Sequence, residues 1–213
     1  MARPRPFTLL PHAVPRRLTD PIVLRMARVG IAPNHVTLAG FAGNVGAGAL
    51  AARGEFLAAG VLMLIASGLD LLDGALARAT GRASAFGAVL DSTLDRLSEA
   101  AVLSGLAYYF AERGDREQVM LCFAAIVGSL MVSYVRARAE YFGLNIKDGL
   151  FTRPERVIVL GAGLIIGSER IASVRIALWV LAVVAGITAL QRLYVVWEHF
   201  RREPPAIEGE ERP

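Results

Sequence analysis

Long apolar blocks restrict what this chain can fold into more than any other feature of its sequence. Hydrophobic residues occupy 54% of the 213 positions, and charged residues only 20%. A helix that crosses a bilayer needs about 20 largely apolar residues. Six segments approach that requirement: 36–52, 56–77, 86–110, 118–141, 156–166 and 171–197. The sequence therefore predicts an all-α membrane protein with six transmembrane helices.

The two ends of the chain differ in composition from these blocks. Prolines interrupt residues 1–30, and the pattern from Thr19 to Val29 predicts an amphipathic helix that lies on the membrane surface. Residues 201–213 contain prolines and an acidic run, which predicts a disordered tail. We therefore expect a juxtamembrane segment over 1–30, a six-helix domain over 31–200 and a cytoplasmic tail over 201–213.

The distribution of arginine predicts the orientation. The net charge is +4, and most arginines fall in segments that share one side of the membrane if the N-terminus is cytoplasmic. We therefore expect a multi-pass protein of the plasma membrane with its N-terminus and its active site in the cytoplasm. The arginines lie between apolar blocks and not along one polar face. Membrane lipids and phosphate-bearing substrates are thus the expected partners, and nucleic acid is not.

Four aspartates interrupt the second and third apolar blocks. Asp70 and Asp73 are three residues apart, and Asp91 and Asp95 are four apart, so each pair shares one face of its helix. The short basic segment between them predicts a turn that brings both pairs together. Four ionised carboxylates repel one another at low dielectric, so a positive partner is required.

Two kinds of positive partner could balance these carboxylates. Arginines are one, and the candidates near in sequence are Arg78, Arg82 and Arg96. Divalent metal is the other, and we favour it because acidic residues within membrane spans are usually functional. All the ligands are hard oxygens, with no His or Cys among them, which favours two Mg²⁺ ions with Mn²⁺ as the alternative. Two such ions would suit an in-line displacement at phosphorus.

The spacing around the acids is more specific than a lone Asp-x-x-Asp. It reads Asp70-x2-Asp73-Gly74-x2-Ala77-Arg78-x8-Gly87-x3-Asp91-x3-Asp95. This resembles the signature of the CDP-alcohol phosphatidyltransferase family at every defined position. The resemblance implies six transmembrane helices, a homodimer and two metal ions held by the four aspartates. It also implies that Asp95 takes the proton of an acceptor hydroxyl, which attacks CDP-diacylglycerol and releases CMP.

The same resemblance assigns a group of residues to the CDP-lipid. They come from the segment before the first span and from the turn after Asp73. The group comprises Ala32, Pro33, Asn34, His35, Thr37, Gly74, Arg78 and Ser84.

A further cluster concerns the acceptor alcohol. Arginines near the cytoplasmic ends of three spans predict a phosphorylated acceptor, since arginine binds phosphate through paired, charge-assisted hydrogen bonds. The positive-inside rule alone would also account for them. The stretches 133–140 and 153–156 resemble the phosphatidylinositol phosphate synthase branch of the family, which uses inositol 1-phosphate. The expected acceptor-phosphate residues are Ser133, Arg136, Arg138, Arg153, Arg156 and Arg192. Arg136 stands where that branch more usually has lysine.

Other functions stay open at this point. Glycerol 3-phosphate as acceptor would make the protein a phosphatidylglycerophosphate synthase, and an ether-lipid donor would give an archaeal-type inositol phosphate synthase. A cation transporter would also use buried carboxylates, but it leaves the glycine, alanine and arginine of the motif unexplained. Membrane prenyltransferases generally need more spans than this chain offers.

Overall fold

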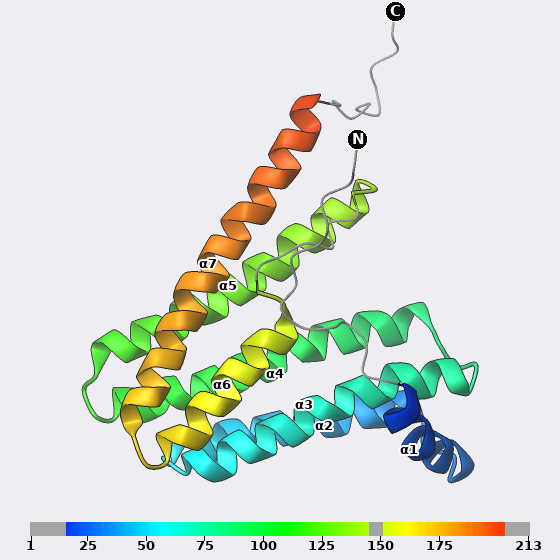
Figure 1. The fold of residues 1–213 in the computed structure, drawn as a ribbon, viewed down its shortest axis with the longest axis horizontal. Helices are drawn as coiled ribbons and strands as arrows, with labels where there is room; N and C mark the ends of the chain where they lie inside the picture. Colours follow the sequence, from blue (N-terminus) through cyan, green and yellow to red (C-terminus); the bar gives the residue numbers. More distant parts are fainter. Residues whose placement is uncertain (1–15, 145–150, 203–213) are drawn as a thin grey trace, which may run out of the picture.

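The computed structural model describes residues 16–144 and 151–202, and within these ranges every regular element is an α-helix. Figure 1 shows how the seven helices are arranged. They are α1 (Arg16–Arg28), α2 (Pro33–Ala52), α3 (Phe56–Ala79), α4 (Ala85–Ala111), α5 (Arg116–Tyr141), α6 (Arg153–Gly167) and α7 (Ile171–Arg202). The predicted all-α class is confirmed.

Three of the described helices, α3, α5 and α7, are long and apolar enough to cross a membrane. The other candidates fall short for identifiable reasons. Helix α6 has only 15 residues, and α4 carries several charged residues along its length. Helix α2 is rich in glycine, which has low hydropathy. Six transmembrane helices therefore remain a prediction.

The ends of the chain differ from the predicted boundaries. Helix α7 continues to Arg202, five residues beyond the predicted end of the last span and into the predicted tail. Residues 203–213 and 1–15 lie outside the described part of the chain. Helix α1 buries Val23 against α2 and α3 and leaves Ile22 and Val29 exposed. Its location on a membrane surface stays a prediction.

Glycines bring the backbones of α2 and α4 into contact. A Cβ atom on Gly105 would lie 2.0 Å from the carbonyl oxygen of Gly48, and one on Gly48 would lie 2.5 Å from that of Ala101. On α2, a Cβ on Gly40 would lie 2.6 Å from Oδ1 of Asp70 in α3. Small residues at membrane helix interfaces permit such close approach. Helix α2 thus holds α3 and α4, the two helices that carry the aspartates, against itself.

The remaining helices complete the bundle around an apolar core. Helix α5 packs against α4 and α7, and α6 packs against α3 and α7. Fully buried leucines from α4, α6 and α7 fill the centre, among them Leu103, Leu106, Leu164 and Leu178. In Figure 1, α5 and α7 run side by side toward the top of the view, while α2, α3 and α4 lie below them.

Candidate active site

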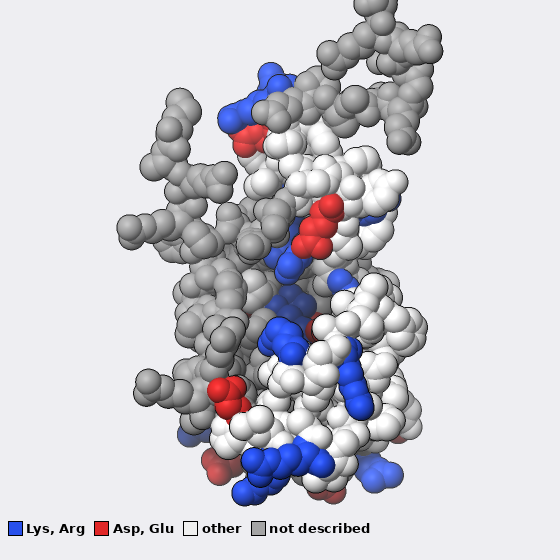
Figure 2. All heavy atoms as spheres, turned by 90° about the vertical axis from the view of Figure 1, so that its right-hand side faces the viewer, with Lys and Arg blue, Asp and Glu red and all other residues white. Residues whose placement is uncertain are grey.

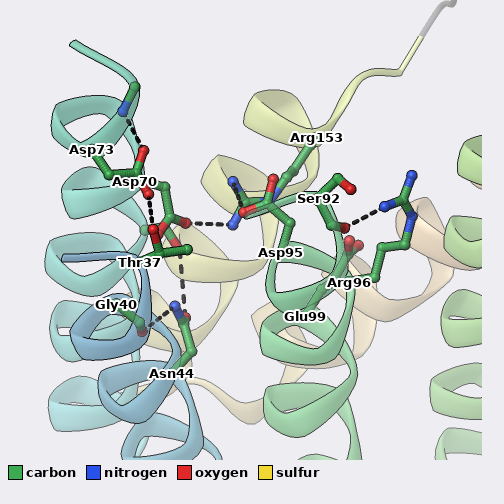
Figure 3. Close-up of polar contacts among 12 residues, drawn as sticks. Thr37, Gly40, Asn44, Asp70, Asp73, Ser92, Asp95, Arg96, Glu99 and Arg153 are labelled. Carbon is green, nitrogen blue, oxygen red and sulfur yellow. Dashed lines mark hydrogen bonds and ion pairs between the residues drawn. The ribbon is translucent and has the colours of Figure 1, made fainter. Parts of the chain in front are cut away.

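An arginine bridges the two helices that carry the aspartates. Arg153, at the start of α6, donates from Nη2 to Oδ2 of Asp70 at 2.6 Å and from Nη1 to Oδ1 of Asp95 at 2.9 Å. Figure 3 shows its side chain between Asp70 on α3 and Asp95 on α4. Arginine was one of the two kinds of positive partner that the sequence predicted for the aspartates. The arginine that pairs with them is not one of the three near in sequence, but one 83 residues from Asp70.

Asp73 is held by α2 and by its own backbone. Asp73 is 4% exposed, and Thr37 Oγ1 donates to its Oδ2 at 2.6 Å. The backbone N–H of Gly74 donates to Oδ1 at 2.5 Å. Hydrogen bonds of this kind offset the cost of burying a carboxylate. The start of α2, which the sequence assigned to the CDP-lipid, therefore also positions an aspartate of the motif.

The donor atoms at this site suit a hard divalent cation. They are carboxylate oxygens, the ligands that Mg²⁺ and Mn²⁺ prefer. Within the described residues, no three Asp, Glu, His or Cys side chains are grouped closely enough to hold a metal ion. The guanidinium of Arg153 instead stands in for a cation between Asp70 and Asp95. Binding of metal by all four aspartates remains a prediction, and it requires Arg153 to move away from these two oxygens.

A cavity of about 250 Å³ lies beside Asp73 and Asp91, between α2, α3 and α4. Most of the residues predicted to bind the CDP-lipid line it: Pro33, Asn34, Thr37, Gly74, Arg78 and Ser84. Ala32 and His35 are not among its lining residues. Ser84 also caps α4, because its Oγ accepts a hydrogen bond from the backbone N–H of Gly87 at 3.0 Å.

A larger cavity of about 440 Å³ lies on the other side of the aspartates, between α4, α5, α6 and α7. Asp95 and Arg153 line it, together with Ser133 and further arginines of the predicted acceptor site, namely Arg136, Arg156 and Arg192. Figure 2 shows arginine side chains gathered around a recess in the middle of one face of the molecule. The structure therefore places one cavity on each side of the acidic motif, and the larger one is rich in arginine.

The arginines of this larger cavity differ in how they are bound. Arg192 is 3% exposed and donates from Nη1 to the carbonyl oxygen of Val132 at 2.9 Å, while its Nε has no hydrogen-bond partner among the described residues. Arg136 donates from Nε to Oε1 of Glu140, one helical turn away, at 2.8 Å. Both guanidinium groups therefore retain N–H donors for an anion in the cavity.

Arg138, predicted to contact the acceptor phosphate, does not line either cavity. Its guanidinium carbon lies 5.3 Å from the ring centroid of Tyr141 and 5.4 Å from that of Phe142. Residues two apart on a helix lie on different faces, and of the two arginines only Arg136 lines the larger cavity. A contact of Arg138 with the acceptor phosphate stays a prediction.

The sequence reasoning missed Glu99, a buried acid in the wall of the larger cavity. It accepts hydrogen bonds from Arg156 at 2.8 Å and 3.0 Å, and from Ser129 Oγ at 2.7 Å. A signal was available, because Glu99 lies four residues after Asp95 and therefore on the same face of α4.

Comparison with known proteins identifies the family of this chain. The family model described as CDP-alcohol phosphatidyltransferase matches residues 30–197. The chain belongs to the CDP-alcohol phosphatidyltransferase family. It is therefore an enzyme of this class and a membrane protein, and its apolar helices agree with that assignment.

Two relatives of this CDP-alcohol phosphatidyltransferase have inositol phosphate synthase names. The phosphatidylinositol phosphate synthase of Mycobacterium tuberculosis is 38% identical over 194 residues, which cover 88% of this chain and 89% of the relative. The archaetidylinositol phosphate synthase of Pyrococcus horikoshii is 39% identical over 175 residues, which cover 79% of this chain and 85% of the relative.

Solved structures of the M. tuberculosis enzyme are similar to this phosphatidyltransferase over most of its length. The crystal structure with CDP-DAG bound has a TM-score of 0.79 and 37% sequence identity, covering 85% of this chain and 94% of that one. A crystal structure of the same enzyme in complex with manganese and citrate also has a TM-score of 0.79 at 37% identity, covering 84% and 88%.

Proposed function

We propose that this enzyme transfers the phosphatidyl group of CDP-diacylglycerol to inositol 1-phosphate and releases CMP. One observation carries the proposal: an arginine-rich cavity opens directly onto Asp95 of the family motif. A neutral acceptor has little use for such a cavity, whereas a phosphate binds arginine through paired, charge-assisted hydrogen bonds. The names of the M. tuberculosis and P. horikoshii relatives support inositol phosphate as the acceptor.

In this proposal, the aspartates hold two divalent cations. Asp70, Asp73 and Asp91 would bind one, and Asp70, Asp91 and Asp95 the other. Mg²⁺ is the expected metal and Mn²⁺ the alternative, and the manganese complex of the M. tuberculosis enzyme supports a divalent metal. When bound, such ions neutralise the diphosphate of the donor and stabilise CMP as it departs.

In this proposal, each of the two cavities binds one substrate. We assign the CDP-lipid to the smaller cavity, where Arg78 can neutralise a phosphate and Gly74 leaves room for it; the CDP-DAG complex of the M. tuberculosis enzyme supports this donor. We assign the acceptor to the larger cavity. Asp95 lines that cavity, so its carboxylate is on the acceptor side and can take the proton of the attacking hydroxyl.

Arg153 has a second role in this scheme. Its contacts with Asp70 and Asp95 compete with any cation that these carboxylates bind, so the guanidinium must turn away when metal is bound. It also lines the acceptor cavity, and turning away from the aspartates leaves its N–H donors available to the acceptor phosphate.

We also propose that the enzyme is a homodimer of the plasma membrane. Each protomer would cross the membrane six times, with the N-terminus and the active site on the cytoplasmic side. The arginines of the larger cavity support this orientation, because cytoplasmic segments of membrane proteins carry an excess of arginine and lysine.

Glycerol 3-phosphate is the second candidate acceptor, since the arginines of the cavity would bind its phosphate equally well. The donor has an alternative too, because the P. horikoshii relative is named for an archaetidyl lipid. The cation transporter that the sequence left open is wrong as an account of this chain, because the chain belongs to an enzyme family.

An acceptor comparison tests the proposal. Purified enzyme with CDP-diacylglycerol and Mg²⁺ or Mn²⁺ is given inositol 1-phosphate, inositol, glycerol 3-phosphate or serine, and CMP release is measured. We expect turnover with inositol 1-phosphate and little with inositol or serine. Turnover with glycerol 3-phosphate alone would refute the inositol assignment and leave the family assignment intact.

A further inference from the structure

Glu99 joins three helices at the wall of the larger cavity. It lies on α4, one turn beyond Asp95, and is 6% exposed. Its Oε1 accepts from Arg156 Nε of α6 at 2.8 Å. Its Oε2 accepts from Arg156 Nη2 at 3.0 Å and from Ser129 Oγ of α5 at 2.7 Å. A buried carboxylate is costly unless it is paired and hydrogen-bonded, and Glu99 meets both conditions.

These contacts leave part of the Arg156 guanidinium unused. An arginine has five N–H donors in a planar fork. Two of the donors are bound by Glu99, and Nη1 donates a third to the carbonyl oxygen of Phe151 at 3.3 Å. Two donors therefore remain on Arg156, which lines the cavity and whose side chain is 4% exposed.

We propose that Glu99 is a positioning residue, which fixes the plane of the Arg156 guanidinium so that its two remaining donors meet the phosphate of the acceptor. The inference rests on the proposed function, in which the larger cavity binds a phosphorylated acceptor. Ser129 belongs to the same arrangement, because its hydroxyl holds the Glu99 carboxylate from the side of α5.

Two effects of Glu99 on phosphate binding oppose each other. Its negative charge lowers the positive potential of the cavity, so removing that charge alone would tighten phosphate binding. Its paired hydrogen bonds fix the orientation of Arg156, so losing them would weaken binding. We expect orientation to dominate, because Asp95 and Glu140 also line the cavity and would compete with the phosphate for a guanidinium released from Glu99.

The substitution Glu99→Gln tests this reasoning, because it keeps the shape of the side chain and removes its charge. We expect the KM for the phosphorylated acceptor to rise by about tenfold to a hundredfold, the effect of weakening one charge-assisted contact to a phosphate. The Kd for inorganic phosphate, measured by titration calorimetry on the purified enzyme, should rise with it. The KM for CDP-diacylglycerol should stay within about twofold of the wild-type value.

Two further variants complete the experiment. Ser129→Ala should shift acceptor KM and phosphate Kd in the same direction by a smaller factor, and it keeps the test open if the Glu99 variant does not fold. Glu117→Gln is the matched control. It makes the same chemical change on α5, where Glu117 accepts a hydrogen bond from Trp179 Nε1 at 3.0 Å and lines neither cavity. It should leave both KM values unchanged.

The outcomes separate this inference from the function on which it rests. Acceptor binding that is unchanged or tighter in Glu99→Gln would show that Glu99 only balances charge. Equal losses in both KM values would show a general structural role, and either result overturns the inference. Failure of the wild-type enzyme to use inositol 1-phosphate would overturn the proposed acceptor. The inorganic phosphate titration would then still decide the role of Glu99.

Discussion

Replacing Arg153 with glutamine removes the guanidinium that donates to both Asp70 and Asp95. If these carboxylates bind divalent metal, Arg153 and the metal compete for the same oxygens. We therefore expect Arg153→Gln to bind Mn²⁺ more tightly than the wild-type enzyme. The same variant should have a higher KM for the acceptor, because it loses a donor from the larger cavity.

The contacts of Arg153 set the size of this effect. The two hydrogen bonds, 2.6 Å to Asp70 and 2.9 Å to Asp95, are both charge-assisted. Such bonds contribute about 1.5–3 kcal/mol each. The Asp70 side chain is 7% exposed, but those of Asp95 and Arg153 are 21% and 24% exposed, so solvent screens the second contact more than the first. If the screened contact is neglected, the variant loses the equivalent of one charge-assisted hydrogen bond, about 1.5–3 kcal/mol. That free energy corresponds to about a tenfold to hundredfold gain in metal affinity.

Titration calorimetry with Mn²⁺ on the detergent-purified enzyme measures this affinity without turnover. Arg136→Gln is the matched control, because it removes one positive charge from the same cavity but pairs with Glu140 and not with an aspartate of the motif. Its metal affinity should change much less. Equal Mn²⁺ affinities in the wild-type enzyme and Arg153→Gln would refute competition between the guanidinium and the metal.

Further substitutions test the base, the helix contacts and the donor site. Asp95→Asn should keep the fold and CDP-lipid binding but lose CMP release. Near-normal turnover in this variant would rule out Asp95 as the base. Gly105→Ala places a Cβ 2.0 Å from the Gly48 carbonyl oxygen and should lower stability by about 1–3 kcal/mol. Its melting temperature can be compared with that of Gly186→Ala, whose Cβ meets nothing within 4 Å. Thr37→Val removes the hydroxyl that donates to a motif aspartate at 2.6 Å. It should raise the KM for CDP-lipid more than that for the acceptor, and the opposite ranking would contradict our placement of the donor.

Helices α3, α5 and α7 were predictable because each rests on a long apolar block, and a block of that length has few alternatives in a membrane. The end of α7 was not predictable from hydropathy. The helix runs past Trp197 into a polar segment, where Arg202 and Glu198 form an i,i+4 ion pair at 2.5 Å. Such local pairs extend a helix without adding any apolar residue.

The acidic motif could be predicted because its spacing places each pair of aspartates on one helix face. The partner of Asp70 could not be predicted. Arg153 is distant from it in sequence, and only the packing of α6 against α3 brings the two side chains together. The helical period also indicates a role for Glu99, which lies one turn from Asp95 on the same face of α4.

The bridge made by Arg153 has a consequence for how this enzyme is assembled. A site built from acids alone would repel itself until an ion arrived, and the ion would then be needed to complete the fold. Here the polypeptide brings its own balancing charge from α6. We therefore expect the chain to reach its native packing before it binds any metal ion. Treatment with a chelator should accordingly yield a protein that is inactive but still folded, and that regains activity as soon as the ion is returned.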